Sequence, residues 1–399
     1  MRQPFPVILK KTPTLPFNHR HWKKTIRLSL CVLAIMAVRP ATASDFVIQI
    51  SVDGLGASYL QNLISIGEAP NFKRFQTEGA WTNNARTDYD YTVTLPNHTS
   101  MLTGRPVLDK FGVTGSGHFY TENGQPGSTT LHDQRGFYVS STFDVVHDRG
   151  MTTGLYATKS KFVLYDQSYD AIAGAPDVIG VDNGRDKIDF YVNDPGDSPP
   201  MLNSFLLNMA AAPSTYSFLH FHDPDSAGHD MGWGSSSYND AVKAVDGYLG
   251  SIFNFINTNP QLNGRTAIIL TADHGGEGYD HGTNTEPLDY TIPFYVWGAG
   301  VAAGRDLYSL NNATRLDPGT GRPDYSAIIS PPIRNGDSGN LALSLLGLPA
   351  IPGSSINGTQ NLAIPEPDSF FLLGFGALVV AGWRCFEKRK RNVSARHDL

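Results

Sequence analysis

Three apolar runs along the chain predict buried β-strands. They cover residues 46–52, 215–221 and 266–270, and each is short and rich in β-branched or aromatic residues. Between them, apolar residues recur at helical spacing over 60–75 and 241–256. Strands that alternate with helices indicate an α/β fold, with a mostly parallel central sheet and helices on both of its faces.

Each predicted strand is followed closely by side chains of the kind that bind metals. Asp53 comes directly after the first strand, and Asp225 comes soon after the second. The third strand leads into Asp273 and His274. Because ligands of open α/β sheets bind beyond the carboxyl ends of the strands, we expect these side chains to gather at one edge. The Gly- and Pro-rich span 110–200 is expected to form a cap or insertion over that edge.

Two further histidines extend this group. His281 follows His274 across a glycine-rich loop, which lets the backbone fold tightly enough to bring both imidazoles together. His229 lies four residues after Asp225, so on a helix the two would share one face. The structural alternatives are an aspartate that orients or caps its neighbours and a surface histidine. Nearby residues that offer the same chemistry are His220, His222, Asp223 and Asp230.

Thr94 opens the sequence Thr-Leu-Pro-Asn, which predicts the start of a helix with Pro96 in its first turn. A helix N-terminus also favours an approaching anion, so a structural and a catalytic interpretation of Thr94 are compatible. Lys159 and Lys161 are interpreted as solvated surface lysines rather than substrate contacts.

Charge and cysteine content narrow the possible functions. Residues 1–43 carry 8 Lys/Arg and no acid, whereas 44–367 hold 17 basic and 34 acidic residues. The body of the chain, residues 44–367, is so acidic that it repels polyphosphate chains, which argues against binding of nucleic-acid polymers. Locally bound cations would still attract a small anionic ester.

Both cysteines, Cys31 and Cys385, lie near the chain ends, so any metal in the body is held by His and carboxylate.

The N-terminal segment has the organisation of a secretory signal. Residues 1–27 are basic, 28–38 are apolar, and 41–43 read Ala-Thr-Ala. This order predicts export through the Sec pathway, with Ser44 at the mature N-terminus. The alternative is a membrane anchor, but this apolar run reaches only about half way across a bilayer core.

The C-terminal segment carries a second signal of this kind. A Pro-Glu-Pro motif at 365–367 precedes an apolar run over 370–383 and then a basic tail. This order resembles the PEP-CTERM sorting signal of Gram-negative bacteria. The resemblance implies membrane insertion through the C-terminal helix, processing by an exosortase, and delivery to the periplasm, outer surface or extracellular matrix. The alternative is an ordinary tail anchor, for which the run is short. The predicted domains are therefore 1–43, 44–362 and 363–399.

Five segments of the body resemble, in order, the motifs of the nucleotide pyrophosphatase/phosphodiesterase branch of the alkaline phosphatase superfamily. They are Val52-Asp53-Gly54, Thr94-Leu95-Pro96-Asn97-His98 with Leu102-Thr103-Gly104, Pro224-Asp225-Ser226-Ala227-Gly228-His229, Thr271-Ala272-Asp273-His274-Gly275, and His281-Gly282. Each motif is weak alone, but all five in order across residues 46–300 are specific. The resemblance implies an alkaline-phosphatase-like three-layer sandwich.

The resemblance also implies two zinc ions and a nucleophile. One zinc would be held by Asp53, Thr94, Asp273 and His274, and the other by Asp225, His229 and His281. Thr94 would attack a small phosphate ester (a phosphodiester, pyrophosphate or monoester) and form a phosphothreonine intermediate. A threonine hydroxyl needs a metal or a base to become nucleophilic, and paired metals stabilise the attacking and leaving oxygens.

Three departures from the family pattern leave the choice between monoester and diester open. Phosphodiesterase relatives place a phosphate-contacting Asn downstream of the nucleophile, where this chain has Thr114, Gly115 and Ser116. A His-Gly pair of the family is replaced by Phe111-Gly112. The gap between His274 and His281 is also shorter than in the nucleotide pyrophosphatases, which removes a segment that often shapes their substrate pocket.

Three other enzyme classes and one non-enzymatic role are alternatives to the phosphohydrolase hypothesis. A sulfatase of the same superfamily needs a Cys or Ser that is converted to formylglycine, whereas position 94 is Thr. A phosphonate hydrolase belongs to the same superfamily, and phosphoglycerate mutases of this kind typically use Ser. A catalytically inactive surface or matrix protein would have lost at least one ligand, yet every ligand position is filled.

Overall fold

The computed structural model describes residues 44–179, 184–326 and 330–364. The predicted signal peptide 1–43 and the Pro-Glu-Pro signal with its tail lie outside the described residues. Residues 363 and 364 still belong to the body: the Ala363 N–H donates to Asn311 Oδ1 at 2.6 Å, and Ile364 is buried. No helix in the described part of the chain has the length and apolar character needed to cross a membrane.

Eight strands form one sheet, which confirms the predicted α/β class. The strands are β1 (Phe46–Val52), β2 (Ala80–Arg86), β3 (Thr153–Ala157), β4 (Phe190–Asn193), β5 (Tyr216–Phe221), β6 (Thr266–Thr271), β7 (Thr291–Gly298) and β8 (Arg305–Asp306). Their order is β4-β3-β5-β1-β6-β7-β2-β8, and only β7 runs antiparallel to its neighbours. The sheet is therefore mostly parallel, and its central strands β1, β5 and β6 are those predicted from the apolar runs.

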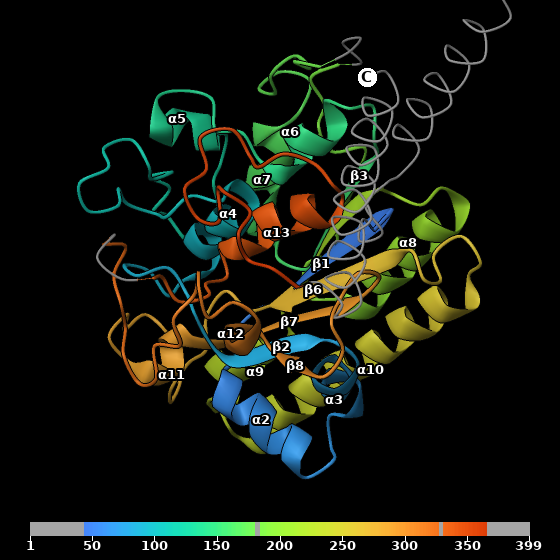
Figure 1. Cartoon of the computed structure of the whole chain (residues 1–399), viewed down its shortest axis with the longest axis vertical. Coiled ribbons are helices and arrows are strands. Elements are labelled where there is room, and N and C mark those ends of the chain that lie inside the picture. The colour runs from blue at the N-terminus through green and yellow to red at the C-terminus, as the bar shows by residue number, and fades with distance from the viewer. Residues whose placement is uncertain (1–43, 180–183, 327–329, 365–399) are drawn as a thin grey trace, which may run out of the picture. The chain divides into compact units, whose positions relative to one another are not determined.

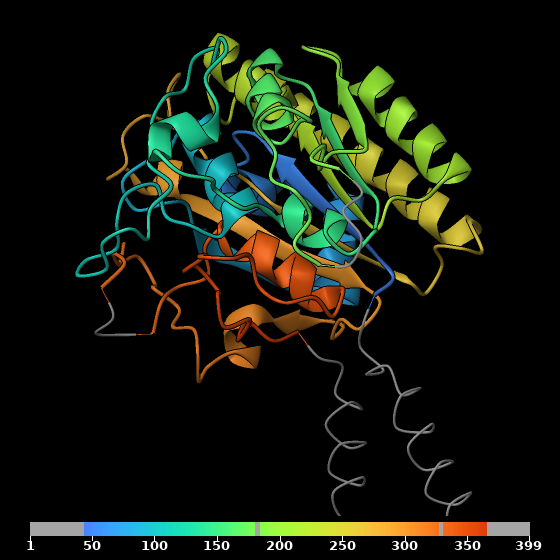
Figure 2. The same cartoon turned by 90° about the horizontal axis from the view of Figure 1, so that it is seen from above.

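Helices cover both faces of the sheet, as Figures 1 and 2 show. They are α2 (Ala57–Ser65), α3 (Pro70–Glu78), α4 (Thr94–Thr103), α5 (Leu131–Arg135), α6 (Thr142–His147), the 3₁₀ helix η1 (Ser160–Phe162), α7 (Val163–Ser168), α8 (Ser198–Ala211), α9 (Asp223–Met231), α10 (Ser236–Thr258), α11 (Pro287–Tyr290), α12 (Leu307–Leu310) and α13 (Asp337–Leu345). Helices α4, α6 and α13 pack together on one face, and α3, α8, α9 and α10 pack on the other.

Two sequence predictions need correction. The helical pattern over 60–75 is two helices, α2 and α3, because the chain turns at Gly67, whose φ of 82° suits glycine. The span 110–200 is more than a cap: β3 and β4 pair in parallel with each other and extend the sheet beyond β5. Neither strand has a long apolar run that marks it in the sequence: β3 is buried but only five residues long, and β4 is a half-buried edge strand of four residues.

Candidate functional site

The carboxyl ends of β5, β1 and β6 lie side by side and bring three aspartates together. Val52 pairs with Phe221, and Ser51 pairs with Thr271, so the residues that follow the three strands are neighbours. The Asp225 N–H donates to the Asp53 carbonyl at 3.1 Å, and the Gly54 N–H donates to Asp273 Oδ1 at 3.1 Å. The predicted convergence of distant segments at one sheet edge is therefore present.

Gly54 makes this convergence possible. Its φ is 70°, and a Cβ at this position would lie 2.8 Å from the Asp225 Cα, so a larger residue would push Asp225 away. Its carbonyl accepts hydrogen bonds from Trp233 Nε1 and the Tyr238 hydroxyl, both at 2.9 Å. The Asp-Gly sequence after β1 thus fixes how closely Asp53 and Asp225 approach.

Six of the predicted residues form two groups whose ligand atoms lie within 4.8 Å of one another. In the described part of the chain these groups are Asp53 with Asp273 and His274, and Asp225 with His229 and His281. In the first, His274 Nε2 lies 3.3 Å from Asp53 Oδ1 and 3.2 Å from Asp273 Oδ2. In the second, Asp225 Oδ1 lies 3.4 Å from His229 Nε2 and 3.6 Å from His281 Nε2. The groups adjoin, since His274 Nε2 is 3.8 Å from Asp225 Oδ1.

All three histidines are oriented in the same way. Each Nδ1 donates to a backbone carbonyl: His229 to Tyr279 at 3.0 Å, His274 to Gly275 at 2.8 Å, and His281 to Thr92 at 2.6 Å. A neutral imidazole that donates from Nδ1 has its lone pair on Nε2. In each case Nε2 is the atom that faces a carboxylate of the group. This is the arrangement by which proteins orient histidine ligands of metals.

The atoms that face one another in the two groups include four without a hydrogen-bond partner. They are Asp53 Oδ1, Asp225 Oδ1, Asp273 Oδ2 and His274 Nε2, all buried. His274 Nε2 lies 3.2 to 3.8 Å from all three of these oxygens, within ion-pair distance, but it forms no hydrogen bond with them. Buried unpaired polar atoms are costly, so their convergence makes the two groups candidate cation sites. Carboxylate oxygen and imidazole nitrogen are suitable zinc ligands.

The charges of the site are strongly coupled. Burial raises the pKa of Asp53, but the Lys159 ammonium, the hydrogen bond from His220 and the nearby His274 imidazole outweigh burial and hold that pKa well below its usual value. Burial and the charge of Asp53 raise the pKa of Asp273 well above its usual value. Burial opposes protonation of His274, yet Asp273 and Asp53 raise its pKa to about 9. Because metal ligands must be deprotonated, a cation bound here would compete with protons for these side chains.

Lys159 corrects a prediction. It is not a solvated surface lysine: its side chain is only 18% exposed, and its Nζ lies 2.7 Å from Asp53 Oδ2 and 2.6 Å from Asp225 Oδ2. Sequence reasoning missed this because Lys159 follows β3, a strand that the apolar pattern did not reveal.

Another residue near the ligands, His220, donates from Nε2 to Asp53 Oδ2 at 2.9 Å and so orients that carboxylate. His220 therefore contacts a predicted ligand without belonging to either group.

Thr94 is the first residue of α4, and it is buried. Its carbonyl accepts from His98 Nδ1 at 2.8 Å, and the same His98 nitrogen lies 3.6 Å from Asp273 Oδ2. The other nitrogen of His98 bonds to Ser51 Oγ of β1 at 2.8 Å. His98 thus fastens the start of α4 to β1, the strand that precedes Asp53, and links the Thr94 backbone to Asp273 of the first group.

Asn123 is the residue that the sequence analysis could not find. Its Oδ1 accepts from the Leu95 N–H at 3.0 Å and from Lys161 Nζ at 3.0 Å. The amide is therefore held at the N-terminus of α4, next to Thr94. The family pattern predicts a phosphate-contacting Asn near 114–116, but the chain forms a loop there and an Asn reaches the helix start only at position 123. Lys161 lies behind this amide and is partly buried.

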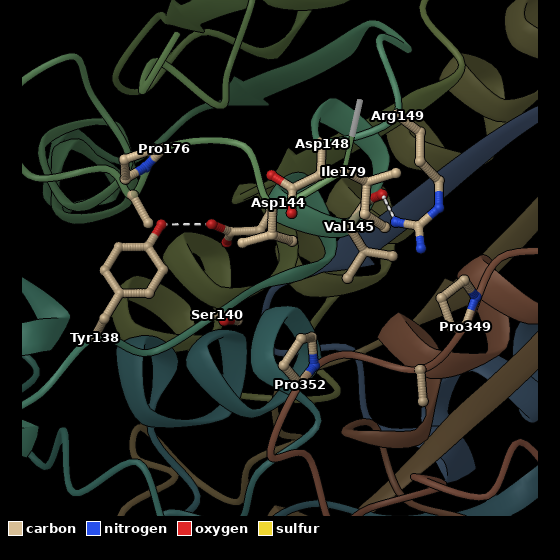
Figure 3. Close-up of a pocket in the computed structure, with 13 residues that line it drawn as sticks. Tyr138, Ser140, Asp144, Val145, Asp148, Arg149, Pro176, Ile179, Pro349 and Pro352 are labelled. Atoms are coloured by element: carbon tan, nitrogen blue, oxygen red, sulfur yellow. Dashed lines mark hydrogen bonds between the residues drawn. The ribbon is translucent and has the colours of Figure 1, made fainter. Parts of the chain in front are cut away.

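A cavity of about 250 Å³ lies elsewhere, between α6 and the segment 349–352 (Figure 3). Its lining is mainly apolar, and the Tyr138 hydroxyl donates to Asp144 at its wall. None of the seven predicted site residues lines it. The candidate functional site is therefore the pair of Asp/His groups at the sheet edge.

Solved structures share this fold. The murine ectonucleotide pyrophosphatase/phosphodiesterase 5, as an inactive variant in complex with AMP, superposes with a TM-score of 0.52 at 14% identity, covering 80% of this chain and 99% of that one. The human ectonucleotide pyrophosphatase/phosphodiesterase 5 gives a TM-score of 0.51 at 14% identity, with 79% and 99% covered. At this identity the likeness concerns the fold.

Curated relatives match parts of the chain. GPI ethanolamine phosphate transferase 1 of Yarrowia lipolytica is 28% identical over 176 residues, 43% of this chain and 18% of that protein. The mouse ectonucleotide pyrophosphatase/phosphodiesterase family member 3 is 24% identical over 262 residues, 62% of this chain and 26% of that protein. The matched part therefore spans about a quarter or less of these longer relatives.

Residues 47–304 match the profile of type I phosphodiesterase/nucleotide pyrophosphatase, and since this is more than half of the sequence, the chain belongs to that family.

Proposed function

We propose that this protein is a metal-dependent hydrolase of phosphate esters with Thr94 as its nucleophile. One observation carries the proposal: two adjoining Asp/His groups turn unpaired, buried ligand atoms toward one another beside the helix start that bears Thr94. We assign two zinc ions to these groups. The first would be held by Asp53, Asp273 and His274 together with Thr94, and the second by Asp225, His229 and His281.

The residues divide the chemistry among them. When bound, two zinc ions supply Lewis-acid stabilisation of the transferring phosphoryl group and lower the pKa of a hydroxyl in contact with them. The Thr94 hydroxyl gives its proton to solvent water and forms a bond to phosphorus, while the bond from phosphorus to the leaving oxygen breaks and that oxygen departs as an anion that solvent can protonate. Water then attacks the phosphothreonine, and the Thr94 oxygen is the second leaving group.

The N-terminus of α4 and Asn123 receive the phosphoryl oxygens. The positive partial charge at the N-terminus of α4 favours an anion at this position, although the Leu95 N–H is already bonded to Asn123 and Pro96 has no N–H. The Asn123 Oδ1 is used by Leu95 and Lys161, so its NH₂ is the part of the amide left to donate to a substrate oxygen. Donors already aimed at developing charge lower the barrier without reorganising during the reaction.

The substrate class is a phosphodiester, pyrophosphate or monoester of a small molecule. Two observations on relatives direct the first assays: AMP is bound to the structurally similar murine protein, and the curated relatives include phosphoethanolamine transferases. The latter suggest a second candidate function, transfer of the phosphoryl group from Thr94 to an alcohol instead of water. Sulfatase chemistry is disfavoured, because position 94 is Thr.

We also propose that the protein is exported and sorted by its terminal segments. The basic and apolar organisation of 1–43 and the Pro-Glu-Pro order of 365–399 support Sec export and exosortase processing. Delivery of the body 44–364 outside the cytoplasm would place its substrate in the periplasm or beyond.

The experiment that tests the function uses residues 44–364, stripped of metal and reconstituted with zinc. Bis-nitrophenyl phosphate, nitrophenyl phosphate, a nitrophenyl phosphonate ester and nitrophenyl sulfate are compared, each also with glycerol as an alternative acceptor. The proposal expects zinc-dependent cleavage of at least one phosphate ester. A glycerol adduct (phosphoglycerol from the monoester, nitrophenyl phosphoglycerol from the diester) is expected only if transfer competes with hydrolysis. No zinc-dependent cleavage of any ester, or preference for the sulfate, contradicts it.

A further inference from the structure

Lys159 bridges the two Asp/His groups. Its Nζ lies 2.7 Å from Oδ2 of Asp53, which belongs to the first group, and 2.6 Å from Oδ2 of Asp225, which belongs to the second. In the described part of the chain, no other lysine or arginine is ion-paired to either carboxylate. A single ammonium thus connects carboxylates from both candidate metal sites.

The backbone around Lys159 is held firmly. Thr158, just before it, donates from Oγ1 to the His220 carbonyl at 3.0 Å, and so ties the end of β3 to β5. Phe162, three residues later, packs against the rings of His220 and His98 at centroid distances of 4.2 and 4.8 Å. The position of the Lys159 side chain therefore follows from anchored backbone on both sides of it.

Lys159 and the candidate metals use different oxygens of the same carboxylates. The ammonium contacts Oδ2 of Asp53 and Oδ2 of Asp225, whereas Oδ1 of each is buried without a hydrogen-bond partner and faces the imidazoles. For Asp53 the division is reinforced by His220, which also bonds to Oδ2. An ammonium on Oδ2 therefore leaves the Oδ1 atoms available to metal ions.

We propose that Lys159 is a positioning residue: a resident cation that holds Asp53 and Asp225 so that each presents one oxygen to its metal, and that stays in place when the metals bind. This inference rests on the proposed function only in taking the two groups as metal sites. In the metal-free protein the same ammonium keeps the buried carboxylates assembled, since unpaired buried charges would repel one another.

Amine labelling of the wild-type protein tests whether Lys159 stays in place. Metal-free and zinc-loaded protein are reductively methylated, and modification at Lys159 is compared by peptide mass spectrometry with that at the exposed Lys73. We expect Lys159 to react roughly tenfold or more slowly than Lys73 in both forms, because its ammonium must first leave charged hydrogen bonds. Faster labelling of Lys159 after zinc is added would mean that metal displaces it, which overturns the inference.

Thermal unfolding of Lys159→Met tests whether the charge assembles the site. We expect the melting temperature to fall by more than about 5 °C in metal-free protein and by clearly less in zinc-loaded protein, where metal replaces part of the lost charge. Lys187→Met is the matched control: Lys187 pairs with Asp148 at 3.3 Å and with Asp177, outside both groups. Its effect should be the same with and without zinc.

Equal effects of zinc on the two variants contradict the inference. Zinc content of the wild-type protein separates this failure from failure of the proposed function. If wild type binds no zinc, the metal sites themselves are wrong. If wild type binds zinc while Lys159→Met behaves like Lys187→Met, only the role of Lys159 is wrong.

Discussion

The imidazole rings of His274 and His281 lie face to face, with centroids 3.5 Å apart and planes inclined by 7°. One histidine belongs to each Asp/His group, so this stack is where the two groups touch. Burial and the neighbouring charge of His274 lower the pKa of His281 to about 3, while that of His274 is raised to about 9. The two shifts run in opposite directions because protonation of one ring disfavours protonation of the other, which would put two buried like charges in contact.

Removing one histidine from each group should remove one metal from each. We expect His281→Ala and His274→Ala each to bind about one zinc per chain fewer than the wild type, measured by elemental analysis after dialysis. Hydrolysis should fall roughly 10²-fold or more in both, since several kcal/mol of charge stabilisation is lost with a metal.

His132→Ala is the control for these variants. His132 bonds to the Ser168 carbonyl at 2.7 Å and is in neither group. It should keep the wild-type zinc content, whatever its effect on stability. A wild-type zinc content in His281→Ala would contradict its assignment as a ligand.

Gly275→Ala should disrupt the site through the backbone. A Cβ at Gly275 would lie 2.0 Å from the Leu288 carbonyl oxygen, in a segment where the Gly276 N–H donates to that same oxygen at 2.9 Å. Because neither backbone segment can move freely, we expect a loss of about 3 kcal/mol in unfolding free energy and reduced zinc binding. Chemical denaturation with and without zinc measures both.

Gly247→Ala provides the comparison for a glycine without crowding. Gly247 is exposed within α10, and nothing lies within 4 Å of its added Cβ. This variant should be more stable than wild type by about 0.5–1 kcal/mol, the usual preference for alanine within a helix. Similar destabilisation in both glycine variants would refute the packing argument at Gly275.

Asn123→Ala should separate substrate binding from metal binding. Removing a donor aimed at the phosphoryl group is expected to lower kcat by about 10²-fold. The zinc content should not change, because Asn123 belongs to neither group. Steady-state kinetics and elemental analysis on the same preparation check this. Unchanged kcat would remove Asn123 from the proposed reaction.

Asp166→Asn should stabilise the protein in a pH-dependent manner. Burial and the charges of Asp186 and Asp170 raise the pKa of Asp166 to about 6. A raised pKa means that the ionised carboxylate costs folding free energy: the cost is absent below the unfolded value of 3.8 and complete above about 6. Screening at this partly exposed position leaves on the order of 1 kcal/mol.

The melting temperature of Asp166→Asn should therefore exceed that of wild type by about 2 °C at pH 7.5 and match it near pH 4. A difference that is constant over this pH range would show that the carboxylate's charge is not its origin.

The part of the site predicted from sequence is the part that follows strongly apolar strands. Asp53 stands directly after β1 and Asp273 two residues after the end of β6, where a continuous hydrophobic run marks the strand and its end marks the ligand. Asp225 and His229 follow β5 in the same way, although they lie within the helix α9 rather than in a loop. Neighbouring parallel strands then bring these residues together without further information.

The part that could not be predicted depends on the chain between 110 and 200. Lys159 follows β3, and Asn123 reaches α4 after an irregular segment, so neither residue has a periodic pattern that marks its position. A lysine after a weakly marked strand also looks like any solvated lysine, and only tertiary contacts reveal its ion pairs. Long-range packing, not local sequence, places these two side chains.

The most direct test of the account is a search for phosphate on Thr94. Zinc-loaded protein is mixed with bis-nitrophenyl phosphate, quenched in acid within the first turnover, digested and analysed by mass spectrometry. The account predicts a nitrophenyl phosphoryl adduct on Thr94 in wild type, and neither adduct nor hydrolysis in Thr94→Ala, which keeps its zinc. Hydrolysis that persists in Thr94→Ala, or an adduct on another residue, would contradict it.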